Sequence, residues 1–102
     1  MHVIARPIIR TFCQRHADAR EWLEEWWRTA TKTRWTSLSD VRTTYASADQ
    51  VAKCLVFNAR GNKYRLIVRV SYRNEYNRGT LLVKEFLTHA EYNEDRWKRG
   101  CQ

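Results

Sequence analysis

The sequence contains little of what bends or crosslinks a chain. Glycine and cysteine occur three times each and proline once in 102 residues, whereas 43% of the residues are hydrophobic. This composition excludes a flexible linker or a disordered tail and indicates one folded domain over residues 1–102. The three cysteines are widely spaced and form no Cys-x-x-Cys pair, so we expect neither a disulfide framework nor a zinc knuckle. Free thiols are typical of a reducing compartment.

Long hydrophobic runs are also missing. No stretch approaches the ~20 apolar residues that a membrane-spanning helix needs, and the first residues lack the apolar core of a signal peptide. We therefore expect a cytoplasmic protein with no membrane partner. The three histidines and three cysteines show no metal-ligand spacing, so we expect no metal and no other cofactor.

Acidic residues are the scarce charged class. The chain has 11 Asp and Glu against 19 Lys and Arg, which gives a formal net charge of +8. Such a balance favours partners that carry phosphate or acidic groups.

The spacing of apolar residues changes near residue 50. Before it, apolar side chains recur at helical spacing and predict two antiparallel helices joined near His16, then a shorter helix from Ser37. After it, alternation predicts strands over 51–58, 64–72 and 80–88, and a short first strand is expected at residues 3–4. The fold class is therefore α+β, with the helices packed on one sheet face. The basic tail over 96–102 is expected to fray.

The strand over 64–72 places arginines on one face. Arg65 and Arg69 alternate with the apolar row that begins at Tyr64, and they lie on the order of 13 Å apart, a span of about two RNA phosphates. Arg60 and Lys63 flank the preceding hairpin loop. These four side chains form a possible cationic cradle on a sheet face left open to a ligand. The alternative is that they only solvate an exposed face.

A second candidate group follows the last strand. Tyr92 comes three residues after His89, so one helical turn would place both side chains on the same side. A histidine and a tyrosine together are able to remove and return a proton. The alternative is a capped helix start, with Thr88 as the cap, Glu91 three residues later and Tyr92 in the core.

The five tryptophans divide into two sets. Trp22, Trp26 and Trp27 recur at helical spacing and are interpreted as core, with a partner-docking surface as the alternative. Trp35 and Trp97 lie outside any clear period, and we expect them to make exposed contacts.

Several blocks of the chain together resemble the HigB-type branch of the RelE toxin superfamily. The resemblance runs over nearly the whole length, and its two most specific blocks are Phe57-Asn58-x-x-Gly61-Asn62-Lys63-Tyr64-Arg65-Leu66 and Thr88-His89-x-Glu91-Tyr92. The weaker blocks are Met1-His2-Val3-Ile4 and Tyr45-Ala46-Ser47-Ala48-Asp49. The polar segment between Tyr72 and Thr80 is the least similar to the family.

This resemblance implies a fold, an activity and a set of partners. The fold is a small curved antiparallel sheet with two N-terminal helices packed on one face. The activity is endoribonucleolytic cleavage of messenger RNA, usually on the translating ribosome, and the expected partner is a helix-turn-helix antitoxin of the HigA type. By position, Arg65 matches the family's sheet arginine, His89 falls where relatives place a catalytic group, and Tyr92 lies near a C-terminal tyrosine.

The expected mechanism uses the substrate's own 2′-hydroxyl as the nucleophile. Arg65, assisted by Arg69 or Lys63, would stabilise the charge on the phosphate, because a guanidinium donates to two oxygens and stays charged. His89 is the candidate acid or base, and Tyr92 the candidate for orienting the nucleotide, although the sequence leaves open which of the two transfers the proton. The competing functions are a non-catalytic nucleic-acid-binding module and a regulatory subunit.

Overall fold

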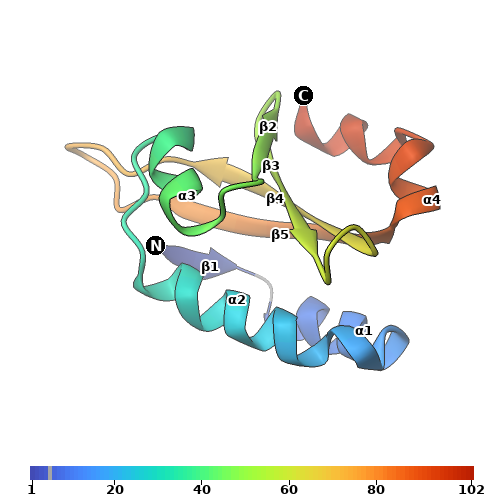
Figure 1. The fold of residues 1–102 in the computed structure, drawn as a ribbon. Helices are drawn as coiled ribbons and strands as arrows, with labels where there is room; N and C mark the ends of the chain where they lie inside the picture. The colour runs from blue at the N-terminus through green and yellow to red at the C-terminus, as the bar shows by residue number, and fades with distance from the viewer. Residues whose placement is uncertain (5) are drawn as a thin grey trace.

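A five-stranded sheet organises the chain, whose computed structural model describes residues 1–4 and 6–102 (Figure 1). The strands lie in the order β1-β5-β4-β3-β2. Their bounds are β1 His2–Ile4, β2 Asp49–Val51, β3 Cys54–Ala59, β4 Tyr64–Ser71 and β5 Thr80–Thr88. The helices are α1 Arg6–Arg15, α2 Arg20–Lys32, α3 Leu38–Thr44 and α4 His89–Asn93, with 3₁₀ helices η1 at Ala17–Ala19 and η2 at Arg96–Cys101. The predicted α+β class is confirmed.

The sheet is mixed, and the expectation of a purely antiparallel sheet is wrong at β1. This strand pairs in parallel with β5, from His2 opposite Thr80 to Ile4 opposite Leu82. The other three pairings are antiparallel. The difference arises because the chain leaves β1 through the helices, enters the sheet again at the far edge and returns strand by strand. The last strand then runs in the same direction as the first.

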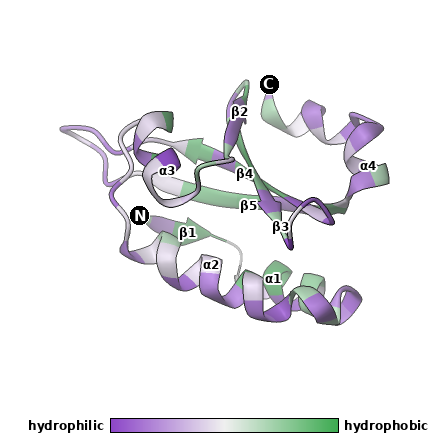
Figure 2. Ribbon diagram, in the orientation of Figure 1, coloured by the Kyte–Doolittle hydropathy of each residue, from purple (hydrophilic) through white to green (hydrophobic). Residues whose placement is uncertain are grey.

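The two long strands β4 and β5 appear where alternation predicts them, and Figure 2 shows hydrophobic colouring along both. The segment predicted as one strand over 51–58 instead forms β2 and β3. A tight turn at residues 52–53 separates them, with Val51 paired to Cys54 and Ala52 in the left-handed region at φ 51°. The apolar pattern continues across this turn, so composition alone does not reveal it.

The main core lies between one sheet face and the first two helices. Ile9 and Phe12 of α1 and Leu23 and Trp26 of α2 belong to the same buried cluster as the predicted β4 row of Tyr64, Leu66 and Val68. Trp22 and Trp27 pack against this cluster while partly buried. The core interpretation of this tryptophan row is therefore confirmed for Trp26.

Trp35 also belongs to the core, so the expectation that it makes exposed contacts is wrong. It is 3% exposed and stacks on Phe57, with 6.1 Å between ring centroids. The irregular segment after α2 folds over the end of the sheet and carries this ring inward, although no helical or strand period marks it.

The expectation that the second sheet face is left open is wrong, because the C-terminal segment packs on it. This packing also corrects three further expectations. Trp97 and Cys101 of η2 are buried against Cys54, Val56 and Ile67. A disulfide joins Cys54 to Cys101, and the Lys53 N–H donates to the Cys101 carbonyl at 2.8 Å. The tail is therefore not frayed, Trp97 is not exposed, and two of the three cysteines are not free thiols. Contacts between segments far apart in the sequence, 47 residues in the case of the disulfide, cause all three differences.

Along residues 1–4 and 6–102, no helix is long and apolar enough to cross a membrane.

Candidate nucleic-acid interface

The charged side chain of Arg65 lies on the second sheet face and is almost completely buried. It is 9% exposed. Its Nη1 donates to the Tyr64 carbonyl at 3.1 Å and its Nη2 to the Asn62 side-chain oxygen at 3.4 Å. None of the ion pairs between described residues involves Arg65. Because a buried charge without a counterion is costly, a bound anion would complete this arrangement.

The local sequence explains why Arg65 lies there. Residue 65 alternates with the core row of β4, so its side chain is on the face away from α1 and α2. It pairs with Asn58 on β3 and Leu87 on β5, at the end of the strand next to the hairpin. The hairpin needs two left-handed residues, Arg60 at φ 54° and Gly61 at φ 67°. This turn brings Asn62 back as an acceptor for the guanidinium.

The aromatic ring of Tyr92 lies against Arg65, a contact that the sequence did not predict. The Arg65 guanidinium carbon lies 5.3 Å from the Tyr92 ring centroid, a cation–π contact. Tyr92 in turn stacks on Trp97 with 5.1 Å between centroids, and the Trp97 indole N–H donates to the Tyr92 carbonyl at 2.9 Å. Sequence reasoning missed Trp97 as a support for the site. The only signal was a large aromatic residue in an otherwise basic tail.

His89 is the first residue of α4 and is exposed. Its helix begins with the capping box that the alternative interpretation describes. The Thr88 hydroxyl accepts from the Glu91 N–H at 3.3 Å, and the Glu91 carboxylate accepts from the Thr88 N–H at 2.9 Å. That bond to the Thr88 backbone lowers the pKa of Glu91. His89 thus lies one helical turn from Tyr92, and no contact in the described part of the chain joins it to Arg65.

The predicted cradle of four cations is not assembled. Lys63 forms an ion pair with Asp18 of η1, and the Tyr64 hydroxyl donates to the same carboxylate at 2.8 Å. The hydrogen bonds from Lys63 and Tyr64 lower the pKa of Asp18, and the bond to Asp18 raises the pKa of Lys63. Lys63 is therefore directed toward the helix side of the sheet. Arg60 is exposed at the hairpin, and Arg69 is half-buried on the same face as Arg65.

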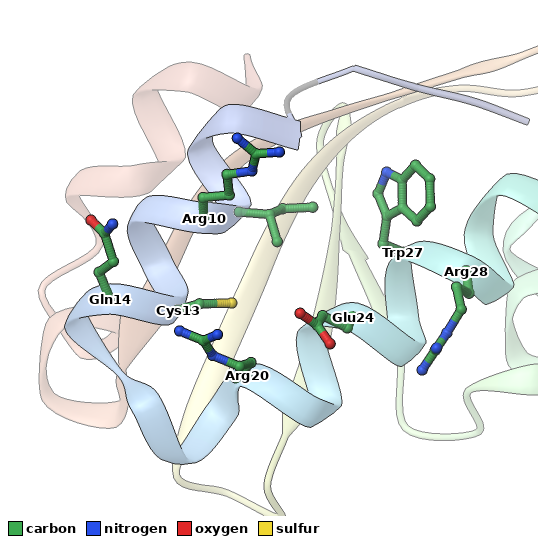
Figure 3. A pocket seen from close by; sticks show the side chains of 8 residues that line it. Arg10, Cys13, Gln14, Arg20, Glu24, Trp27 and Arg28 are labelled. Carbon is green, nitrogen blue, oxygen red and sulfur yellow. The ribbon is translucent and has the colours of Figure 1, made fainter.

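A separate cavity of about 480 Å³ opens between α1 and α2 (Figure 3). Ile9 and Cys13 are its buried walls, and its charged lining residues are Arg10, Arg20, Glu24 and Arg28. Burial raises the pKa of the Cys13 thiol, so it stays protonated and weakly nucleophilic near neutral pH. Sequence reasoning did not identify this cavity. No group of three His, Cys, Asp or Glu residues suited to a metal ion occurs in the described part of the chain.

The protein is therefore a small α+β protein with a strongly positive net charge. Its candidate site contains a buried arginine, Arg65, supported by the aromatic rings of Tyr92 and Trp97. The model of the HigB toxin family, a RelE-like toxic component of a toxin-antitoxin system, matches residues 19–95. No curated protein matches the chain. Because the family match covers well over half of the sequence, the chain belongs to the HigB-type toxin family, as the resemblance predicts. Membership implies an antitoxin partner.

Proposed function

We propose that this protein is an endoribonuclease that cleaves messenger RNA on the ribosome, with Arg65 as the residue that contacts the scissile phosphate. The observation that supports this most is the Arg65 guanidinium, which is nearly buried, ordered by two acceptors and an aromatic ring, and without an acidic partner among the described residues. A phosphate group is negatively charged and presents pairs of oxygens, to which such a guanidinium donates two parallel hydrogen bonds.

The proposed chemistry needs no external nucleophile. The ribose 2′-oxygen attacks the adjacent phosphorus, the bond to the 5′-oxygen breaks, and a 2′,3′-cyclic phosphate remains. The two hydrogen bonds that Arg65 makes within the protein leave several of its N–H donors for the phosphate oxygens, where negative charge develops. Because the protein already orders the guanidinium, little reorganisation is needed at the moment of reaction.

The proton transfers are assigned to His89. Its position on the first turn of α4 puts it on the element that carries Tyr92, and its exposure leaves both ring nitrogens accessible to RNA. An imidazole also changes protonation near neutral pH, which suits an acid or base. Tyr92 is assigned a positioning role, since its ring already contacts Arg65 and Trp97. Arg69 and Arg60 are assigned to binding the flanking phosphates.

The partners follow from the same proposal. A toxin that cuts messenger RNA on the ribosome acts in the cytoplasm and needs an antitoxin to hold it inactive. We propose a helix-turn-helix antitoxin of the HigA type for that role.

One observation favours the second candidate, a non-catalytic RNA-binding module. The capping box of Thr88 and Glu91 gives the His89-to-Tyr92 block a structural purpose that requires no chemistry. This module would use the same arginines without transferring a proton.

Cleavage products separate the two candidates. Purified protein is incubated with programmed ribosomes, and the 3′ ends of the RNA fragments are analysed. We expect 2′,3′-cyclic phosphate ends from the wild type. Arg65→Lys keeps the charge but loses the planar fork, so it should cut at least about 100-fold more slowly. RNA that is bound but never cut by folded wild-type protein would establish the binding module instead.

A further inference from the structure

A cationic cleft lies at the end of the sheet where β1 begins. It has a volume of about 530 Å³ and is lined by Lys32, Arg34, Arg73 and Arg78, together with Met1, His2, Thr31 and Thr33. No acidic side chain is among these lining residues. In Figure 1 the loop after β4, which carries Arg73 and Arg78, is at the opposite end of the sheet from α4. The cleft is therefore separate from the Arg65 site.

Backbone hydrogen bonds hold three distant segments together around this cleft. The His2 N–H donates to the Gly79 carbonyl at 3.2 Å, and the Arg73 N–H donates to the Trp35 carbonyl at 3.0 Å. The Met1 amino group donates to the Thr33 carbonyl at 2.5 Å. Gly79 permits the close approach, because a Cβ there would lie 2.8 Å from the Arg73 backbone nitrogen. The basic side chains converge because the fold brings their backbones together.

The charges of the cleft are not neutralised within the protein. No ion pair between residues of the described chain uses Lys32, Arg34, Arg73 or Arg78. Burial, and then the charges of Arg73 and Arg34, lower the pKa of the Met1 amino group. Like charges that converge without an acidic partner repel one another, and a bound anion relieves that repulsion.

The loop that carries Arg78 also presents an aromatic ring. Tyr76 is 92% exposed, so its ring is accessible to a partner. The Asn74 side chain accepts from the Tyr76 N–H at 2.8 Å, and the Asn77 side chain accepts from the Gly79 N–H at 2.8 Å. Figure 2 shows the rest of this loop as hydrophilic. An exposed ring on the same loop as Arg73 and Arg78, together with the basic cleft, is the combination with which proteins bind single-stranded RNA.

We infer that this cleft binds the phosphates of a single-stranded RNA segment while Tyr76 stacks on one of its bases. The inference rests on the proposed function, in that it assigns a second contact to the same substrate class. Eight residues of extended chain separate Arg65 from Arg73, a distance of roughly 26 Å. The cleft therefore holds RNA several nucleotides away from the scissile phosphate and contributes to binding without taking part in cleavage.

The test measures RNA affinity against salt concentration. The probe is a short fluorescein-labelled 2′-O-methyl oligoribonucleotide, which the proposed mechanism cannot cut, and the readout is fluorescence anisotropy. Loss of two phosphate contacts in R73Q/R78Q should reduce the logarithmic salt slope by about 1.4 and weaken binding roughly 10- to 30-fold at 0.1 M salt. The matched control is R10Q/R28Q, which removes the same charge from the cavity between α1 and α2. We expect its slope to stay close to that of the wild type.

The stacking contact has a different signature. Tyr76→Ala should weaken binding by at least about fivefold with an unchanged salt slope, and Tyr76→Phe should restore the affinity. Thermal melts check that each variant is folded. The inference is overturned if the salt slope of R73Q/R78Q equals that of the wild type, or if the salt slope of R10Q/R28Q falls as much as that of R73Q/R78Q. An acidic protein segment would then be the next occupant of the cleft to test. If the variants change RNA binding as expected but the wild-type protein does not cleave unmodified RNA, the proposed function is overturned and the inference about the cleft stands.

Discussion

The guanidinium of Arg65 lies 5.3 Å from the ring centroid of Tyr92, although 27 residues separate them in the chain. Strand β4 supplies the arginine and helix α4 supplies the ring. Trp97 supports the ring from the C-terminal segment, so the orientation of the arginine depends on a part of the chain that carries no residue of the proposed chemistry. This relationship makes the role of Tyr92 testable apart from that of His89.

Substituting Tyr92 distinguishes orientation from proton transfer. Tyr92→Phe keeps the ring under Arg65 and loses only the hydroxyl, so we expect a cleavage rate within about threefold of the wild type. Tyr92→Ala removes the platform, including a cation–π contact of about 0.5–2 kcal/mol, and should lower both the rate and the melting temperature. Single-turnover cleavage at saturating enzyme is the measurement. A Tyr92→Phe variant that folds but no longer cuts would move the proton transfer from His89 to Tyr92.

His89→Gln should reduce the single-turnover rate by roughly 10²-fold or more, because a general acid or base is lost. Its RNA affinity and melting temperature should stay close to those of the wild type, since His89 is exposed and the Thr88–Glu91 capping box is intact. The control is Thr88→Ala, which breaks the cap and should cost about 1 kcal/mol of stability. A lowered melting temperature with a normal rate for His89→Gln would support the purely structural interpretation of this block.

The Cys54–Cys101 disulfide should anchor the C-terminal segment over the second sheet face. Reduction, or the variant Cys101→Ser, opens a loop with a sequence separation of 47. The free energy of unfolding should then fall by up to about 4 kcal/mol. Tryptophan fluorescence should shift to the red as Trp97 becomes accessible to water. Denaturant unfolding with and without a dithiol measures both effects, and superimposable curves would contradict the crosslink. Cys13→Ala, which removes the free cysteine, is the control and should keep the response to the dithiol.

The pairing of Asp18 with Lys63 and Tyr64 predicts a dependence of stability on acid. These hydrogen bonds depress the pKa of Asp18 in the folded state. Its contribution is therefore present above the unfolded-state pKa of about 3.9 and is lost as the pH falls through the lower folded value. The melting temperatures of wild type and Asp18→Asn should differ at neutral pH and converge below about pH 4. A difference that persists at low pH would mean that the charge of Asp18 is not what stabilises the fold. The bond to Asp18 raises the pKa of Lys63 in the folded state, so the contribution of the Lys63 charge to stability is lost only at strongly alkaline pH.

The sequence by itself determined the features that depend on neighbouring residues. Alternation over 64–72 predicted β4 and the face on which Arg65 lies, because each residue's side in a regular strand is set by its parity. The position of β5 was also predicted, but a bulge in its pairing with β4 breaks the parity, so that Val83 and Phe86 lie on the same face. Thr88 and Glu91 likewise predicted the capping box of α4, because a helix cap depends only on residues a few positions apart. The family also followed from short blocks of residues.

Only the tertiary structure decided where distant segments meet. The parallel pairing of β1, the ion pair between Asp18 and Lys63, and the burial of Trp97 each join parts of the chain far apart in sequence. No periodicity within a segment contains that information. Lys63 has the same charge as Arg65 two residues later, yet it is directed to the opposite side because Asp18 lies there. The basic tail packs for a similar reason: its Trp97 and Cys101 lie against an apolar sheet face around Ile67, and removing their apolar surface from water stabilises that position.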